Sequence, residues 1–321
     1  MASTADQWRA DDPSDGDSHS LTRLQESAHA LAERLPDLLI DAKRISQTVA
    51  HGIHGRRRSG PGETFWQFRT YESADSAQLI DWRRSASSDH LYVREREWEA
   101  AHTVWMWSDL SASMDFKSHL TKVSKRDRAV VLMLASAELL MRGGERIGLM
   151  AMSQPSGSRR IASLLAEAII ANVSSPLINK SRPPAQQIPR HAEVLLFGDF
   201  LAPVPAIRER IEQLASLGAR GHMVQVLDPA EETLPYDGRA EFSNASGRER
   251  FLADRVETLR AEYQKRLADH RAQIEEFTHR LGWSFLVHHT DRPASEPLLT
   301  LVMRLAGEMG AVYRAETAEA V

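Results

Sequence analysis

The sequence predicts an α/β fold built on a doubly wound, mainly parallel sheet, with N-terminal helices and a small β-rich N-terminal extension. Short apolar runs alternate with segments of helical periodicity over residues 104–287, and the connections are of crossover length. Two of the runs end in acids, at Asp109 and Asp199. Because parallel strands present their carboxyl ends at one edge of a sheet, we expect both carboxylates at that edge.

The N-terminal residues predict a tail followed by helices. Residues 1–20 are rich in Asp, Ser and Ala, and we expect them to be disordered. Apolar residues recur at helical spacing in 21–34 and in 36–49, with Pro36 suited to the first turn of the second helix. The basic loop at 52–62 lacks nearby aromatic stacking positions. A solvated loop is therefore favoured there over an anion-binding or nucleic-acid patch.

A charged segment leads from this loop into the alternating region. Residues 65–71 and 91–99 alternate between polar and apolar side chains, which indicates strands with one wet face. Between them, Asp81 and Arg83 flank Trp82. A structural ion pair beside a buried Trp82 is favoured here over a partner-binding role.

The chain divides into a tail and two further parts. The segment of residues 65–99 is too short to bury a good core alone. We therefore expect residues 21–100 to pack on a main domain formed by residues 101–314.

The main domain is expected to contain five strands, an intervening set of helices and a long helix near its end. The long helix, at 248–280, has a narrow apolar seam, and packing on its own domain is favoured over a coiled-coil contact with a partner. A last helix is expected at 296–309. The strands are expected at 104–107, 147–152, 194–197, 223–227 and 284–287.

The first of these strands runs into an Asp-x-Ser-x-Ser pentad formed by Asp109, Ser111 and Ser113. One carboxylate and two hydroxyls at this spacing can face one point, and they are the hard oxygen ligands that Mg²⁺ accepts. The alternative is an ordinary turn, because Asp and Ser are also common turn and cap residues. A second strand that ends in an acid, at Asp199, favours the metal site.

This arrangement resembles the von Willebrand factor A domain and its metal-ion-dependent adhesion site. The resemblance implies that the pentad binds Mg²⁺ directly and that Asp199 binds it through water. That site also uses a Thr from a middle loop, whereas the matching stretch, 172–182, offers only Ser174, Ser175 and Ser181. The resemblance therefore implies weaker Mg²⁺ binding here than in complete sites.

The segment before the pentad also resembles the bacterial domain-of-unknown-function family numbered fifty-eight. The resemblance spans about residues 65–199 and departs from the usual family pattern at Ala74, Gln78 and Gly198. Members typically accompany MoxR-type AAA+ ATPases, so the resemblance implies such a partner and a role in the maturation or assembly of client proteins. The residues that carry it, in order, are Tyr71, Glu72, Asp75, Ile80, Asp81, Trp82, Ser85, Ala86, Leu91, Val93, Arg94 and Glu95.

Composition narrows the function classes. The chain has 321 residues, and its net charge of -4 gives no reason to expect a nucleic-acid binder. The absence of cysteine excludes disulfides, thiolate metal sites and cysteine nucleophiles, and fits a reducing cytosol. No apolar run approaches the roughly 20 residues needed to cross a bilayer, and the N-terminus lacks a signal-peptide pattern. We therefore expect a cytoplasmic protein.

Motifs of the common hydrolases do not occur. The chain has no Gly-x-x-x-x-Gly-Lys loop, His-Glu-x-x-His pair or Gly-x-Ser-x-Gly elbow. His288 and His289 follow the last strand, but further metal ligands at suitable spacing are not evident. We therefore expect a non-enzymatic protein-interaction module with a Mg²⁺-dependent contact at the pentad. A structural scaffold with a degenerate metal site is the main alternative. A metal-dependent phosphohydrolase is less favoured, because no nucleophile or base beside the metal is evident.

Overall fold

The computed structural model describes residues 13–54, 65–71, 80–86, 88, 90–96, 102–172, 175, 180–243 and 250–305. Contacts divide the chain into two compact units. The larger unit comprises Met1–His51 and His102–Val321, and the smaller comprises Gly52–Ala101.

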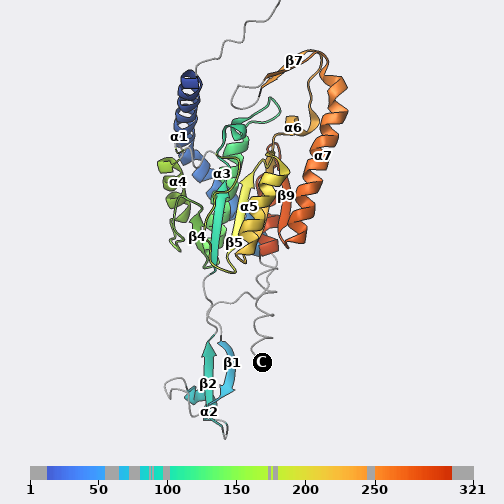
Figure 1. Ribbon diagram of the computed structural model, residues 1–321. Coiled ribbons are helices and arrows are strands. Elements are labelled where there is room, and N and C mark those ends of the chain that lie inside the picture. The colour runs from blue at the N-terminus through green and yellow to red at the C-terminus, as the bar shows by residue number, and fades with distance from the viewer. Residues whose placement is uncertain are drawn as a thin grey trace, which may run out of the picture. The chain divides into compact units, whose positions relative to one another are not determined.

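The larger unit is built on a five-stranded sheet in which every pairing is parallel (Figure 1). Its strand order, β4-β3-β5-β6-β9, places the first strand of the unit inside the sheet, with later strands added on both sides. This arrangement confirms the predicted fold class. The strands are β3 (Thr103–Ser108), β4 (Arg146–Leu149), β5 (Glu193–Gly198), β6 (Arg220–Leu227) and β9 (Ser284–His289).

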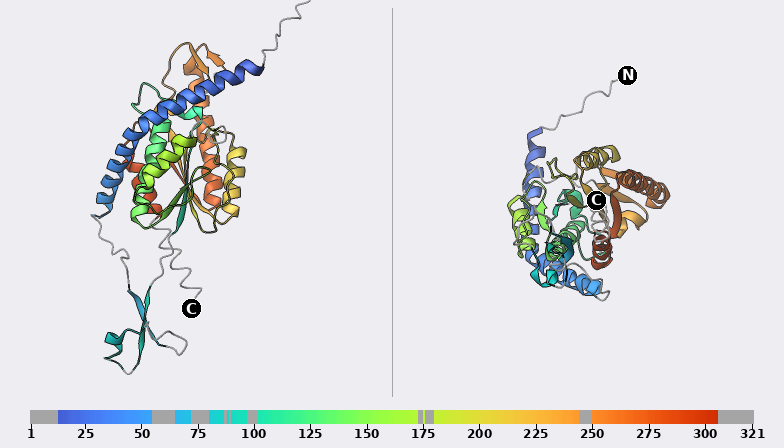
Figure 2. Two further views of the ribbon diagram at one scale, coloured as in Figure 1. Left: turned by 90° about the vertical axis from the view of Figure 1, so that its left-hand side faces the viewer. Right: turned by 90° about the horizontal axis from the view of Figure 1, so that it is seen from below.

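Helices cover both faces of this sheet, as Figure 2 shows. The helices α3 and α4 contact each other on one face, and α5 and α7 contact each other on the other face. A helix also runs from residue 295 to at least 305, within the range predicted for the last helix. The bounds are α3 (Lys125–Arg142), α4 (Ile161–Asn172), α5 (Val204–Ser216), α6 (Pro229–Thr233) and α7 (Val256–Arg280).

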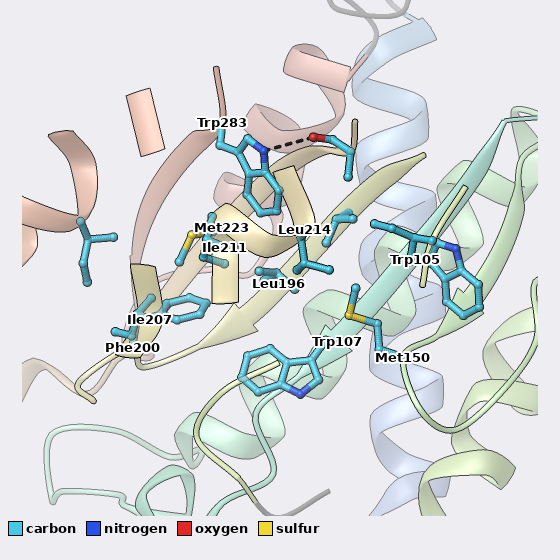
Figure 3. Packing of buried hydrophobic residues seen from close by; sticks show 14 of the residues in the cluster. Trp105, Trp107, Met150, Leu196, Phe200, Ile207, Ile211, Leu214, Met223 and Trp283 are labelled. Atoms are coloured by element: carbon cyan, nitrogen blue, oxygen red, sulfur yellow. Dashed lines mark hydrogen bonds between the residues drawn. The ribbon is translucent and has the colours of Figure 1, made fainter. Parts of the chain in front are cut away.

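The core beneath α5 and α7 is rich in aromatic side chains (Figure 3). Trp105 and Trp107 lie two residues apart on β3 and therefore point to the same face of the sheet. Trp283 closes the core near the amino ends of the strands, where its indole Nε1 donates to the carbonyl of Ala219 at 3.3 Å. A Cβ at Gly221 would lie 2.1 Å from the Trp283 ring, so only glycine fits beside this indole.

The N-terminal region forms one helix, α1 (Pro13–His54), and not the two helices predicted on either side of Pro36. Proline removes one helical hydrogen bond, but a continuous apolar stripe crosses it and packs on the larger unit. Residues 13–20, which were expected to belong to the disordered tail, lie in α1, and residues 1–12 lie outside the described range. The buried stripe is Leu31, Leu35, Leu38, Ala42 and Val49.

The long helix begins later than predicted. Arg250–Ala253 is a strand, β8, which pairs antiparallel with β7 (Ala240–Ser243), so α7 begins only at Val256. The apolar seam packs on the chain's own domain, where Ile274 and Phe277 join the core beneath α5. That packing agrees with the favoured interpretation of the seam.

The smaller unit is an antiparallel pair, β1 (Phe65–Thr70) and β2 (Tyr92–Arg96), with a one-turn helix α2 (Trp82–Ser85) between them. The prediction that Trp82 is buried is wrong, because the residue is 64% exposed. Asp81 caps α2 by accepting a hydrogen bond from the backbone N–H of Arg84 at 3.0 Å. The cap fixes Trp82 as the first residue of a single helical turn. The packing of this segment on the main domain stays a prediction.

None of the helices in the described part of the chain combines the length and apolarity needed to span a bilayer. The expected cytoplasmic location is not tested by this finding and stays a prediction.

Candidate functional site

The two predicted acids lie together at the carboxyl edge of the sheet. Asp109 directly follows β3, and Asp199 directly follows its parallel neighbour β5. The Asp109 N–H donates to the carbonyl of Phe197 at 2.8 Å, which continues the pairing of the strands past the end of β3. A Cβ at Gly198 would lie 3.0 Å from the Asp109 Cβ, so the missing side chain lets the two strand ends approach closely.

A chain of hydrogen bonds joins all four residues predicted for the site. The Ser111 N–H donates to Asp109 Oδ1 at 2.8 Å. The hydroxyls of Ser111 and Ser113 lie 3.1 Å apart, and Ser113 donates to Asp199 Oδ2 at 2.8 Å. The pentad therefore does more than turn the chain, because its hydroxyls connect the ends of two strands.

Asp109 is fully buried, and only one of its two carboxylate oxygens accepts a hydrogen bond from the described residues. Its Oδ2 atom has no hydrogen-bond partner among the described residues. Burial and the nearby charge of Asp199 raise the pKa of Asp109 to about 7, against the lowering effects of the Ser111 hydrogen bonds and the Lys125 charge. An orphaned buried oxygen of this kind is where an additional donor or cation is expected.

Two further residues of the site were missed by the sequence reasoning. The Lys125 ammonium donates to Asp199 Oδ2 at 3.0 Å and to Glu231 Oε1 at 2.5 Å. Glu231 belongs to α6, more than a hundred residues downstream of Lys125. The sequence contained one sign of this contact, because a lysine was expected near the start of a helix. A lysine in the first turn opposes the helix dipole and is stabilised by an anionic partner.

Other contacts hold the loop between β3 and α3 in place. Arg126 donates to the carbonyls of Leu110 and Ser111 and pairs with Asp115. Asp228, the N-cap of α6, accepts from the Ser118 N–H at 2.8 Å and from the Thr121 hydroxyl at 3.2 Å. The loop is therefore anchored at the pentad and again at the start of α6.

The predicted middle loop is described only in part. Ser174 lies outside the described residues, whereas Ser175 and Ser181 lie within them. The hydrogen-bond chain at the pentad runs through Ser111 and Ser113.

The oxygen atoms of the pentad and Asp199 can be compared with the ligands that Mg²⁺ prefers. The orphaned Asp109 Oδ2 and the two hydroxyls are suitable hard donors. Asp199 Oδ2, however, already accepts from Ser113 and from the Lys125 ammonium. Within the described residues, no group of three or more His, Cys, Asp or Glu side chains is arranged to hold a metal. Lys125 therefore already supplies a positive charge beside Asp199, and Mg²⁺ binding stays a prediction.

The two histidines that were predicted to follow the last strand are the final residues of β9, and they do not join the pentad chain. His289 pairs with Glu232, which also pairs with Arg271 at 2.8 Å. His288 is buried, and its Nε2 atom has no hydrogen-bond partner in the described part of the chain. Burial, with smaller effects from Arg128 and His289, lowers the pKa of His288 to about 3.

Known proteins resemble this chain at several levels. Uncharacterized protein Rv1480 of Mycobacterium tuberculosis and uncharacterized protein Mb1516 of Mycobacterium bovis are each 29% identical to it over 282 residues, covering 82% of this chain and 86% of theirs. Among solved structures, the conserved hypothetical protein BatB from Bacteroides thetaiotaomicron aligns with a TM-score of 0.36 at 14% identity, covering 64% of this chain and 100% of its own. An aerotolerance-related membrane protein from Bacteroides fragilis aligns at 0.32 and 14%, covering 62% and 96%.

TM-scores as low as those of the two Bacteroides structures support no statement about function. The family model described as "Protein of unknown function DUF58" matches residues 67–273. That match covers more than half of the sequence and includes the pentad, Asp199 and Lys125, so the chain belongs to the DUF58 family.

Proposed function

We propose that this chain is a non-enzymatic protein-interaction module that binds its partner at the carboxyl edge of the sheet, around the pentad. The observation that carries the proposal is a set of exposed apolar side chains beside the buried polar chain. Phe116 and Leu201 are 40% and 38% exposed. They lie in the loops that follow β3 and β5. Apolar side chains grouped on a rigid surface are typical of binding sites.

The position of this apolar rim follows from the site's own contacts. The Lys125 ammonium lies 6.0 Å from the centroid of the Phe116 ring. The Leu201 N–H donates to Asp199 Oδ1 at 3.2 Å. Phe116 and Leu201 therefore flank the Lys125–Asp199 pair, and a partner that covers them also covers the pentad.

Burial argues against the phosphohydrolase alternative. A phosphoester must reach a nucleophile or base beside the reacting phosphorus. Asp109 and Asp199 are both buried, and Asp199 is neutralised by Lys125. We therefore expect no hydrolysis of phosphoesters by the purified protein, with or without Mg²⁺.

A scaffold with a degenerate metal site is the second candidate. Lys125 favours it, because this residue holds a positive charge beside Asp199, where the adhesion-site resemblance implies a metal. The scaffold and the interaction module differ in whether the rim is needed for partner binding.

For the partner, we propose a MoxR-type AAA+ ATPase acting in the maturation or assembly of client proteins. Family membership supports this choice, because such ATPases typically accompany members of the family. The apolar rim supports the choice of surface.

The test uses the full chain and the MoxR-type ATPase encoded nearest to it. We expect Phe116→Ser with Leu201→Ser to weaken binding at least about tenfold, since truncating central apolar contacts of an interface costs roughly 1–2 kcal/mol or more. Phe251→Ser, on the exposed face of β8, is the matched control and should bind as wild type does. Calorimetry or biolayer interferometry gives the affinity. Equal affinity of the rim variant and wild type would reject the proposed surface.

A further inference from the structure

Lys125 occupies a position that is unfavourable for it in isolation. It is the first residue of α3, directly after the N-cap Ser124, whose hydroxyl accepts from the Asp127 N–H. A positive charge there opposes the helix dipole. Its side chain is also only 1% exposed, and a buried ammonium is costly unless it is paired. The surrounding structure must therefore supply compensating negative charge.

Two carboxylates from separate parts of the chain supply that charge. The ammonium contacts Asp199 Oδ2, at the end of β5, and Glu231 Oε1, in α6. Burial lowers the pKa of Lys125, but the charges of Asp199 and Glu231 raise it more, so the net effect is a raised pKa. Lys125 therefore remains an ammonium near neutral pH and joins three segments of the fold.

Hydrogen bonds also connect the Lys125 ammonium to the pentad. Asp199 Oδ2 accepts from Lys125 at 3.0 Å and from the Ser113 hydroxyl at 2.8 Å. Ser113 in turn contacts Ser111, whose N–H contacts Asp109. A divalent ion bound by these oxygens would lie close to a fixed positive charge, which repels it.

We propose that the Lys125 ammonium is the built-in cation of this site. It takes the electrostatic role of a divalent ion, so that the pentad and Asp199 are held together without Mg²⁺. A metal ion enters only when the ammonium is removed. This inference rests on the proposed function only in placing the binding surface at the pentad.

A second observation concerns the oxygen atoms that would bind a metal ion. Asp109 is fully buried, and its Oδ2 atom lacks a hydrogen-bond partner among the described residues. Without the ammonium, this oxygen, Asp199 and the two hydroxyls offer two carboxyl groups and two hydroxyls, the hard oxygens that Mg²⁺ and Mn²⁺ accept. Neutralising Lys125 therefore converts the site from metal-independent to metal-binding.

The experiment compares wild type, Lys125→Met and the matched control Lys117→Met, which removes an exposed lysine from the same loop. Each full-length protein is melted in EDTA and in millimolar Mg²⁺, and Mn²⁺ binding is followed by electron paramagnetic resonance. We expect wild type and Lys117→Met to show no Mg²⁺-dependent shift in Tm and no stoichiometric Mn²⁺ binding. We expect Lys125→Met to bind one Mn²⁺ and to gain about 3 °C or more when Mg²⁺ is at about ten times its dissociation constant.

A second variant covers the outcome in which Lys125→Met does not fold. Lys125→Met with Glu231→Gln removes the ammonium together with one of the buried charges that it neutralises, and it should bind Mn²⁺ in the same way. Stoichiometric Mn²⁺ binding by wild type would overturn the proposal, and that measurement needs no variant. Folded Lys125 variants that bind no more Mn²⁺ than wild type would overturn it as well. No partner protein is present, so the result is independent of the proposed interaction.

Discussion

Buried ionisable side chains lie at both ends of the same sheet, and they have different surroundings. At the carboxyl edge, Lys125 joins Asp199 and Glu231 beneath an exposed apolar rim. At the amino edge, His222 Nδ1 lies 2.7 Å from the Ser284 hydroxyl, and His222 Nε2 lies 3.6 Å from Glu193. The cluster at the amino edge connects adjacent parallel strands, whereas the cluster at the carboxyl edge connects the end of β5 to α3 and α6.

The difference lies in what covers the two clusters. At the amino edge, His222 is fully buried and Trp283 packs against Gly221, so the cluster closes the core. At the carboxyl edge, loops carry Phe116 and Leu201 outward beside the buried charges. Similar groups of side chains therefore serve packing at one end and, as proposed above, support a binding surface at the other.

The largest expected effect is that of Lys125→Ala on stability. Removing one member of a buried ionic network leaves the others uncompensated, which typically costs about 3–5 kcal/mol. Urea denaturation measures the loss in the free energy of unfolding. Lys117→Ala, on the exposed surface of the same loop, should stay within about 0.5 kcal/mol of wild type. A loss below about 1 kcal/mol for Lys125→Ala would mean that the ammonium does not neutralise the buried acids.

The same substitution at two glycines compares the edges directly. A Cβ at Gly221 would lie 2.1 Å from the Trp283 ring, whereas a Cβ at Gly198 would lie 3.0 Å from the Asp109 Cβ. We expect Gly221→Ala to cost about 3 kcal/mol through overpacking, and Gly198→Ala about 1 kcal/mol.

Partner binding should separate these two variants further. Gly198→Ala displaces the pentad and should weaken binding of the ATPase, whereas Gly221→Ala should leave the affinity of the folded protein unchanged. Thermal melting measures the stability of each variant, and calorimetry measures its affinity for the ATPase. Equal effects of both variants on affinity would mean that the carboxyl edge is no more involved in partner binding than the amino edge.

A further expected effect concerns pH and His288, at the carboxyl end of β9. Its folded-state pKa of about 3 lies below the ordinary value of 6.5, so the unfolded chain binds a proton that the folded chain does not. Stability from this residue is therefore complete above about pH 6.5 and is lost as the pH falls from there towards 3. The loss should be about 3 kcal/mol at pH 4.

Chemical denaturation at pH 8 and pH 4 measures this loss. His288→Gln should reduce the difference in unfolding free energy between the two pH values, relative to wild type. His119→Gln, at an exposed histidine, is the control and should leave the difference unchanged. Identical acid sensitivity of wild type and His288→Gln would show that His288 titrates normally.

The alternating pattern was sufficient to predict the sheet. Runs such as 104–107 and 194–197 are apolar throughout, which is typical of strands covered on both faces, and they form β3 and β5. The same pattern placed Asp109 and Asp199 after neighbouring strands. The boundaries were less certain, because Pro36 did not end α1 and residues 250–253 paired with β7 before α7 began.

The sequence by itself determined the class of the sheet, the edge on which the pentad lies and the four residues that its hydrogen bonds connect. These follow from local periodicity and from the geometry of parallel strands. Only the tertiary structure revealed that Lys125 and Glu231 complete the cluster, since their contacts join segments separated by 74 and 106 residues. It also decided that Trp82 is exposed, because burial depends on whether another part of the chain covers a side chain, which no local pattern specifies.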